Sequence, residues 1–348
     1  MISNGLFFSN LSSFHKQEIP FVAFRFPNSN ILSLSVAKKF PIAPAFLNKE
    51  PGFIIMPFNI EKKGYLIPTD KTCSTKIIPS NKAFCPRKNL IKPNTASLQK
   101  ERYLNTVSEI LSKISTTELT KLVYSEVFDF DINPKNLNTF FQRLLNFNPN
   151  AFCYLFYHPK EGFWIGASPE TLLTIEDKKI TTMALAGTKK RTVSKWSNKE
   201  ILEQKIVQDE IQKNLTPYCE SLHIEKTHTS NAGNIDHLKT VLTGTTSSSP
   251  LEIIRAIHPT PAVAGAPKNT ALSIIKDKEC HDRSFYSGYL GLINEFDCKL
   301  FVNLRCAQIK KNRAKVFVGG GITKDSLPEK EWEEIIEKSQ TILNALCI

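Results

Sequence analysis

Three segments of the sequence carry carboxyl groups that could do chemistry. The turn GASPE ends in Glu170, directly after an expected strand. A later amphipathic segment holds Glu203, and EWEEIIEK near the end places Glu331, Glu334 and Lys338 on one helical face. Carboxyl groups serve enzymes as proton donors and as ligands of hard cations. The structural alternatives are a solvated turn, an i,i+4 surface pair of Glu203 with the preceding lysine, and a solvated helix face.

Two loops could approach a ligand closely. Residues 258–267, HPTPAVAGAP, hold three prolines that restrict φ and small residues that allow close backbone approach. The glycines at 319–321 follow an expected strand, and their backbone N–H groups could face an anion. Their spacing is not that of a nucleotide-binding loop. A packing wall explains the first loop equally well, and a simple turn explains the second.

The elements that must position these segments follow from apolar spacing. Two capping boxes, Ser197 with Glu200 and Ser326 with Glu329, predict the start of two helices. The pattern predicts helices over 99–115, from 197 onward, over 269–279 and over 328–346. It predicts strands over 121–130, 152–157, 163–167, 172–175, 180–185, 285–293, 298–309 and 314–318, and short strands and loops over residues 1–100. The fold class is therefore α+β, with large, mostly antiparallel sheets and helices on their faces.

Bulk composition excludes several function classes. The chain has 348 residues and a net charge of +12, with the excess concentrated in the first third. Its basic residues are singles and pairs, such as Lys38-Lys39, which favours a solvated face over nucleic-acid binding. None of the eight cysteines forms a C-x-x-C pair, so reduced thiols in a cytoplasm are expected. The N-terminus does not resemble a signal peptide, and no apolar run approaches the roughly 20 residues of a membrane span.

Taken in order, the segments resemble those of the chorismate-binding enzyme family, which includes isochorismate, salicylate, anthranilate and aminodeoxychorismate synthases. The resemblance covers about residues 117–345, and it divides the chain into residues 1–116, a divergent N-terminal part of the same fold, and residues 117–348, the catalytic region. It implies an anthranilate-synthase-like fold with the active site between two sheets. The matching stretches are KLVYSE (121–126), GASPETLL (166–173), ALAGT (184–188), KEILEQ (199–204), HLKT (237–240), HPTPAVAGAP (258–267), ExxxRSFYSGYLG (279–291), LFVNLRCAQI (300–309) and GGGITKDSLPEKEWEEIIEK (319–338).

The resemblance implies a reaction and a metal. Lys121 matches the lysine that activates water in isochorismate and salicylate synthases, and Glu170 matches the general acid. Lysine is protonated in water at neutral pH, so its surroundings must favour the neutral form. Glu203 and Glu334 match two ligands of Mg²⁺. Ala186 stands where aminodeoxychorismate synthases tend to carry a lysine. Water is therefore the expected nucleophile, and Mg²⁺-dependent isochorismate synthesis from chorismate is the expected activity.

The resemblance also implies the substrate contacts. Arg305 and Tyr286 match positions that hold the enolpyruvyl carboxylate, with help from the backbone of Gly319. Lys338 would stand near the ring carboxylate and the metal. The ring would lie against Leu185, Gly187 and Thr188, with His237 close by. A structural histidine explains His237 equally well.

Four residues depart from the family pattern, and three other functions stay open. Glu126 stands in place of a common Arg, Gln204 of a His, Ser284 of a Gly and Gly320 of an Ala. Salicylate synthase, anthranilate synthase component I and a catalytically silent binding protein are the alternatives. The resemblance suggests a monomer, and the product would serve menaquinone or siderophore biosynthesis.

Overall fold

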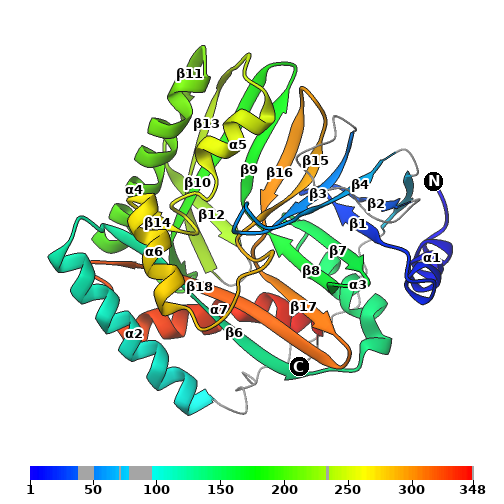
Figure 1. Ribbon diagram of the computed structural model, residues 1–348, viewed down its shortest axis with the longest axis horizontal. Coiled ribbons are helices and arrows are strands. Elements are labelled where there is room, and N and C mark those ends of the chain that lie inside the picture. Colours follow the sequence, from blue (N-terminus) through cyan, green and yellow to red (C-terminus); the bar gives the residue numbers. More distant parts are fainter. Residues whose placement is uncertain (38–50, 70–71, 78–95, 233–234, 347–348) are drawn as a thin grey trace.

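The computed structural model describes residues 1–37, 51–69, 72–77, 96–232 and 235–346. In these ranges the chain forms two large sheets with helices on their outer sides (Figure 1). All strand pairs are antiparallel. The helices are α1 (Asn4–Lys16), α2 (Ala96–Thr116), α3 (Leu137–Phe147), α4 (Asn198–Leu215), α5 (Pro250–Ile257), α6 (Lys268–Lys278) and α7 (Pro328–Leu346).

Each sheet contains strands from distant parts of the chain. The first sheet runs in the order β14 (Gly265–Ala266), β6 (Lys121–Asp131), β18 (Arg313–Thr323), β17 (Cys306–Lys310), β8 (Gly162–Ser168), β7 (Phe152–His158), β1 (Phe21–Arg25), β2 (Ile31–Val36) and β5 (Thr72–Lys76). The second runs β11 (Ser221–Ile224), β13 (Ile235–Thr245), β10 (Lys179–Lys190), β9 (Thr171–Glu176), β16 (Cys298–Val302), β15 (Tyr289–Ile293), β3 (Gly52–Met56) and β4 (Tyr65–Pro68), and β12 (His228–Ala232) pairs with β13. Strands from the first 76 residues thus complete both sheets.

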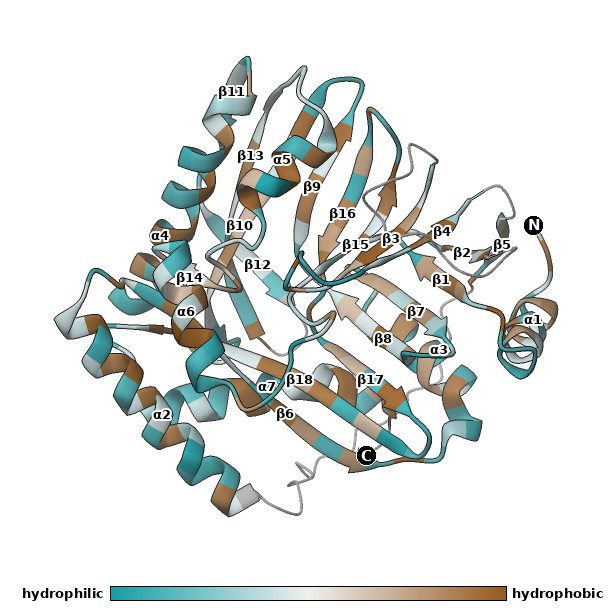
Figure 2. Ribbon diagram, viewed as in Figure 1, coloured by the Kyte–Doolittle hydropathy of each residue, from teal (hydrophilic) through white to brown (hydrophobic). Residues whose placement is uncertain are grey.

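Strands β1, β3 and β7 are buried on both faces. In β1, Phe24 joins a core between the two sheets, while Phe21 joins the core between the first sheet and its helices, as side-chain alternation requires. The core between the sheets is aromatic: Phe152 of the first sheet stacks on Phe301 of the second, with ring centroids 4.2 Å apart. Figure 2 shows the strands largely brown and the helices α2 and α4 alternating brown and teal. Helices therefore shield the outer faces of both sheets.

Two helices bring candidate site residues to the same strand. Helices α2, α3 and α7 cover the first sheet, and α4 and α5 cover the second. The predicted capping box of α4 is confirmed: the backbone N–H of Ser197 donates to the carboxylate of Glu200 at 3.1 Å. Both α4 and α7 contact β18. Side chains from the two helices can therefore meet at this strand.

The chain crosses between the sheets at two short corners. Strand β8 belongs to the first sheet and β9 to the second, with Pro169 and Glu170 between them. Strand β16 belongs to the second sheet and β17 to the first, with residues 303–305 between them. The corners are joined, because the N–H of Val302 donates to the carbonyl of Glu170 at 3.0 Å and that of Ala167 to the carbonyl of Arg305 at 3.1 Å. Glu170 and Arg305 are thereby held side by side.

Most predicted elements in the catalytic region are confirmed, with three corrections. The second capping box is wrong: α7 begins at Pro328, so Leu327 and not Ser326 takes the capping position. The hydroxyl of Ser326 instead accepts the N–H of Thr323, and Glu329 pairs with Lys100. The single strand expected over 298–309 is two strands, and the one expected over 285–293 begins only at Tyr289.

The glycine triplet is not a turn. Residues 319–321 continue β18 and pair with residues 123–125 of β6. Tight contacts explain why side chains are absent: a Cβ on Gly319 would lie 2.7 Å from the hydroxyl of Tyr286, and one on Gly321 would lie 2.1 Å from a carboxylate oxygen of Glu203. The glycines therefore bring β18 close to side chains from other elements.

Three helices were not predicted. These are α1, α3 and α5, in segments that apolar spacing left as loops or short strands. The six cysteines of the described ranges are free thiols, as predicted, whereas Cys85, Cys347 and the pair Lys38-Lys39 lie outside the described residues. Within the described part of the chain, no helix is both long and apolar enough to cross a membrane.

Candidate active site

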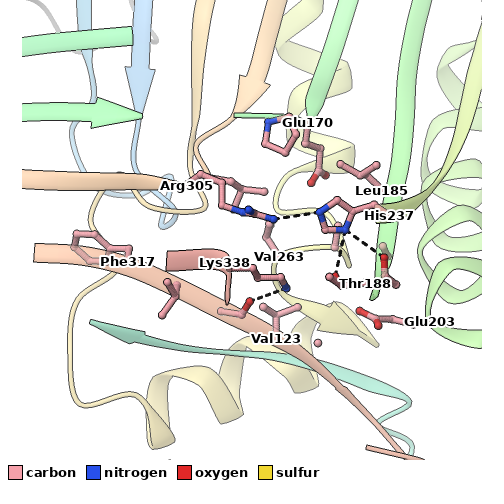
Figure 3. A pocket seen from close by; sticks show the side chains of 18 of the residues that line it. Val123, Glu170, Leu185, Thr188, Glu203, His237, Val263, Arg305, Phe317 and Lys338 are labelled. Carbon is pink, nitrogen blue, oxygen red and sulfur yellow. Dashed lines mark hydrogen bonds between the residues drawn. The ribbon is translucent and has the colours of Figure 1, made fainter. Parts of the chain in front are cut away.

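A cavity opens beside the two corners that join the sheets (Figure 3). Its empty space is about 640 Å³, including open solvent at the mouth. Further lining comes from Val123, Pro169, Ala186, Ala262, Val263, Leu304, Phe317, Val318 and Gly321, none of which was predicted individually as a site residue, although Ala262, Val263 and Gly321 lie in the two loops expected to approach a ligand. The predicted site residues that line it are Glu170, Leu185, Gly187, Thr188, Glu203, His237, Tyr286, Arg305, Gly319 and Lys338.

Glu170 is built to hold a proton. Its side chain is 2% exposed, and burial raises the pKa of its carboxyl group to about 8, against the opposing effect of Lys121 and Lys338. At neutral pH the carboxyl group is therefore mostly protonated. A neutral carboxylic acid that faces a cavity can donate its proton to a group bound there.

Lys121 is the first residue of β6 and is 1% exposed. Its ammonium group pairs with a carboxylate oxygen of Glu203 at 3.1 Å. Gly321 makes room for this pair, because its missing Cβ would also lie 3.1 Å from Cε of Lys121. Lys121 does not itself line the cavity, but its partner Glu203 does. In the view of Figure 3, Glu170 and Glu203 lie at opposite ends of the pocket, with His237 between them.

Arg305 supplies a buried positive charge. Its φ of 48° is in the left-handed region, at the corner between β16 and β17. Burial lowers the pKa of Arg305 to about 10, so the group stays charged at neutral pH. One nitrogen donates to the hydroxyl of Thr341 at 3.2 Å and another lies 3.1 Å from Nε2 of His237 (Figure 3). A guanidinium held this way suits a carboxylate ligand.

His237 is a neutral partner of that guanidinium. Burial, Arg305 and Lys338 lower the pKa of His237 to about 3. Because Arg305 can only donate, Nε2 of the ring must accept, and the ring proton is on Nδ1. Nδ1 lies 3.2 Å from the carbonyl of Gly187, which accepts that proton, and 3.2 Å from the hydroxyl of Thr188. Residues of β10 thus hold the ring of His237, and the ring orients Arg305.

A bulge in β10 shapes the opposite wall. The pairing of β10 with β13 shifts between Ala186 and Thr188, and Gly187 has φ 69° at that point. A Cβ on Gly187 would lie 2.8 Å from the carbonyl of Glu200 on α4. Gln204 fixes the bulge, because its side chain accepts the N–H of Ala186 at 2.8 Å. The bulge explains why Leu185, Gly187 and Thr188 all reach the cavity.

The remaining wall comes from β18 and α7. The ring of Tyr286 stacks on Phe317, with centroids 5.5 Å apart. The ammonium group of Lys338 donates to the carbonyl of Gly319 at 3.0 Å and pairs with Glu334 at 2.6 Å. Glu334 does not line the cavity, but its ion-pair partner Lys338 does.

The acidic residues at this end could hold a divalent cation. Glu203 and Glu334 offer carboxylate oxygens, and a second oxygen of Glu331 is buried with no hydrogen-bond partner. Mg²⁺ takes one or two carboxylates and keeps several waters, so this donor set fits it. In the described ranges, no three His, Cys, Asp or Glu residues form a preassembled metal cluster.

Two charged residues near this site were not predicted to act there. Glu331 was placed on the same helical face as Glu334, and Lys199 was placed as a surface partner of Glu203. Instead Lys199 crosses from α4 to α7 and pairs with Glu331 at 2.7 Å. The carboxylate stripe on α7 was the signal for Glu331, whereas no local signal joined Lys199 to it.

Comparisons with known proteins agree with this architecture. A family model described as "Chorismate binding enzyme" matches residues 71–347. A vibriobactin-specific isochorismate synthase of Vibrio cholerae is 29% identical over 262 residues, which are 70% of this chain and 66% of the relative. An isochorismate synthase of Haemophilus influenzae is 29% identical over 252 residues, 68% of this chain and 59% of the relative. The chain thus spans less than two-thirds of the length of these relatives.

A solved structure carries the same fold. The menaquinone-specific isochorismate synthase of Escherichia coli superposes with a TM-score of 0.78 at 21% identity, over 94% of this chain and 88% of that chain. Its likeness confirms the predicted α+β fold of two large antiparallel sheets with helices outside. Because the family model matches well over half of the sequence, the chain belongs to the chorismate-binding enzyme family.

Proposed function

We propose that the chain is an isochorismate synthase, an isomerase that converts chorismate to isochorismate with Mg²⁺. The observation that carries the proposal is that one cavity is lined by Glu170, a buried acid protonated at neutral pH, and by Glu203, the ion-pair partner of the buried Lys121. By resemblance, Lys121 matches the lysine that activates water and Ala186 stands where aminodeoxychorismate synthases tend to carry a lysine, so water is the nucleophile that we propose. Two related proteins that carry this name support the assignment.

The proposed reaction exchanges one hydroxyl group for another. Lys121, in its neutral form, takes a proton from water as the water oxygen bonds to C2 of the chorismate ring. The ring double bond shifts, the bond from C4 to its hydroxyl oxygen breaks, and Glu170 donates its proton so that the oxygen leaves as water. One water enters and one leaves, so substrate and product are isomers. The acid is essential because hydroxide is a poor leaving group.

The other residues hold the substrate. Chorismate is a dicarboxylate, and Arg305 with Tyr286 would bind its enolpyruvyl carboxylate. Lys338 would face the ring carboxylate, and Leu185 with Thr188 would lie against the ring. Glu203 and Glu334 would hold Mg²⁺, which supplies positive charge to the ring carboxylate when bound.

Product chromatography tests the proposal directly. Pure protein is incubated with chorismate and Mg²⁺ without ammonia, and isochorismate without pyruvate is the expected result. Salicylate with pyruvate would reassign the chain as a salicylate synthase. Turnover that begins only when ammonia is added would show that water is not the nucleophile. We propose that the product serves siderophore or menaquinone biosynthesis, and the name of the vibriobactin-specific relative supports the siderophore branch.

Replacing His237 with leucine is expected to raise the KM for chorismate about tenfold or more and to change kcat less. The substitution removes the acceptor that orients the charged Arg305, and such hydrogen bonds contribute about 1.5–3 kcal/mol. Steady-state kinetics separate the two parameters. A kcat that falls with KM unchanged would give His237 a part in proton transfer instead.

Replacing Gly321 with alanine is expected to lower activity more than stability. The new Cβ would overlap a carboxylate oxygen of Glu203, which must move away from Lys121. Because that oxygen ends a flexible side chain, we expect an unfolding cost of about 1 kcal/mol. The matched control is Gly320→Ala, whose Cβ would meet Tyr103 at 3.2 Å, Ile335 at 3.4 Å and a carboxylate oxygen of Glu331 at 3.5 Å, all without the overlap seen at Gly321. Equal activity losses in the two variants would contradict the assignment of Gly321.

A further inference from the structure

Each carboxylate at the proposed metal site already has a lysine partner. Glu203 pairs with Lys121 at 3.1 Å, and Glu334 pairs with Lys338 at 2.6 Å. Both of these lysines have roles in the proposed reaction. The third pair has none: it joins Glu331 of α7 to Lys199 of α4 at 2.7 Å.

Lys199 lies in the field of all three carboxylates. Its side chain is 14% exposed, and that of Glu331 is 2% exposed. Burial alone would lower the pKa of Lys199, but Glu334, Glu203 and Glu331 outweigh burial and raise it well above the usual range. Two of these three carboxylates, Glu334 and Glu203, are the proposed metal ligands. The ammonium group is therefore held between the two helices that carry the ligands.

The charges at this site balance without a metal. At most three negative charges, on Glu203, Glu331 and Glu334, meet three ammonium groups. A divalent cation would add two positive charges close to the ammonium group of Lys199, which Glu331 holds at 2.7 Å. Like charges repel strongly at short range where water is scarce. The unpaired second oxygen of Glu331 shows that the lysine does not satisfy the site completely.

We propose that Lys199 is a positioning residue that joins α4 to α7 through Glu331 and weakens the binding of Mg²⁺ to the substrate-free protein. The ammonium group keeps the acidic side chains in place when no cation is bound, at the expense of affinity for the cation. The inference rests on the proposed function only for the identity of the metal.

Calorimetric titration of the full chain with MgCl₂, in the absence of chorismate, tests this role. Lys199→Met is expected to bind Mg²⁺ at least about tenfold more tightly than the wild-type protein. The control is Lys205→Met, on the same helix, where the lysine pairs with Asp209 at the surface. The control should leave Mg²⁺ affinity unchanged. Unchanged or weaker Mg²⁺ binding by Lys199→Met would overturn the proposal.

A second pair of variants covers the case in which Lys199→Met does not fold. Glu331→Gln removes the partner charge, and the double variant Lys199→Met/Glu331→Gln removes both and leaves no unpaired carboxylate in the bridge. The double variant is expected to bind Mg²⁺ at least about tenfold more tightly than Glu331→Gln alone. Equal affinities would refute the role of Lys199.

The outcome is independent of the proposed reaction. If Lys199→Met binds Mg²⁺ more tightly while the wild-type protein makes no isochorismate, this inference is kept and the proposed activity is rejected. If the wild-type protein makes isochorismate and Lys199→Met binds Mg²⁺ with unchanged affinity, the proposed activity is kept and this inference is rejected.

Discussion

Replacing Lys121 with alanine is expected to lower kcat for isochorismate formation by about 10²- to 10⁴-fold, the usual contribution of a general base. Lys121 is buried beside the cavity and has Glu203 as its ion-pair partner. In the described ranges, the lysine that lines the cavity itself is Lys338, whose ammonium group is bound to Gly319 and Glu334. No neighbouring base is therefore placed to replace Lys121. Product chromatography under single-turnover conditions measures the loss.

The same substitution also breaks a buried ion pair, which typically costs about 3–5 kcal/mol of stability. Lys121→Arg separates the two effects, because arginine keeps a positive charge next to Glu203 but stays protonated. We expect this variant to be more stable than Lys121→Ala and equally inactive. Lys315→Ala, at an exposed position of the neighbouring strand β18, is the matched control and should keep full activity. Recovery of activity in Lys121→Arg would show that the charge, and not proton transfer, is what the reaction needs.

Apolar spacing predicted those elements whose pattern of buried and exposed residues is set by one sheet packed against one layer of helices. Strand β6 and the β7–β8 hairpin lie within a residue or two of their predicted bounds, and helix α4 begins where its capping box predicted. Their signals are local, because alternating burial, turn residues and a capping box are all read within about ten residues. The site residues were instead predicted from the order of nine motifs. Ten of these predicted site residues line one cavity.

Where the chain changes sheets, local patterns are misleading. Residues 298–309 read as one strand because apolar residues continue through the corner. The break occurs because the chain leaves β16 of the second sheet and enters β17 of the first. Arg305 takes a left-handed conformation at this corner. Ser284 behaves similarly: it has φ 50° where relatives usually carry glycine, and its N–H donates to the side chain of Asp282 at 2.9 Å. Such conformations carry no apolar signature.

Contacts between distant helices were also beyond sequence reasoning. Lys199 and Glu203 have the spacing of a surface pair, yet burial of both side chains brings other partners. Glu126, in place of a common arginine, is buried and pairs with Arg102 of α2 at 2.8 Å. Gln204, in place of a common histidine, holds α4 to the bulge of β10. The departures from the family pattern therefore have structural partners that only the fold brings close.

Replacing Glu170 with glutamine is expected to lower kcat by about 10²- to 10⁴-fold with little change in KM. Glutamine has nearly the same shape, but its amide cannot give a proton to the departing hydroxyl group. The pKa of about 8 also predicts a pH dependence for the wild-type protein: kcat falls as pH rises through about 8, because the required acid loses its proton. A rate that stays constant between pH 7 and pH 9.5 would exclude Glu170 as the acid.

Glu170→Gln should at the same time make the protein more stable in alkaline solution. The folded state binds the Glu170 proton with a pKa of about 8, whereas an unperturbed glutamate titrates at 4.5. The wild-type protein therefore loses stability as pH rises from about 4.5 to about 8, by roughly 1.4 kcal/mol for each pKa unit of the shift. Glutamine does not ionise and avoids that loss. Urea unfolding at pH 5 and pH 9 should show the variant close to the wild-type protein at the lower pH and more stable at the higher. If the advantage were absent at pH 9, the carboxyl group would be ionised in the folded protein at neutral pH, and the proton for the leaving group would have to come from elsewhere.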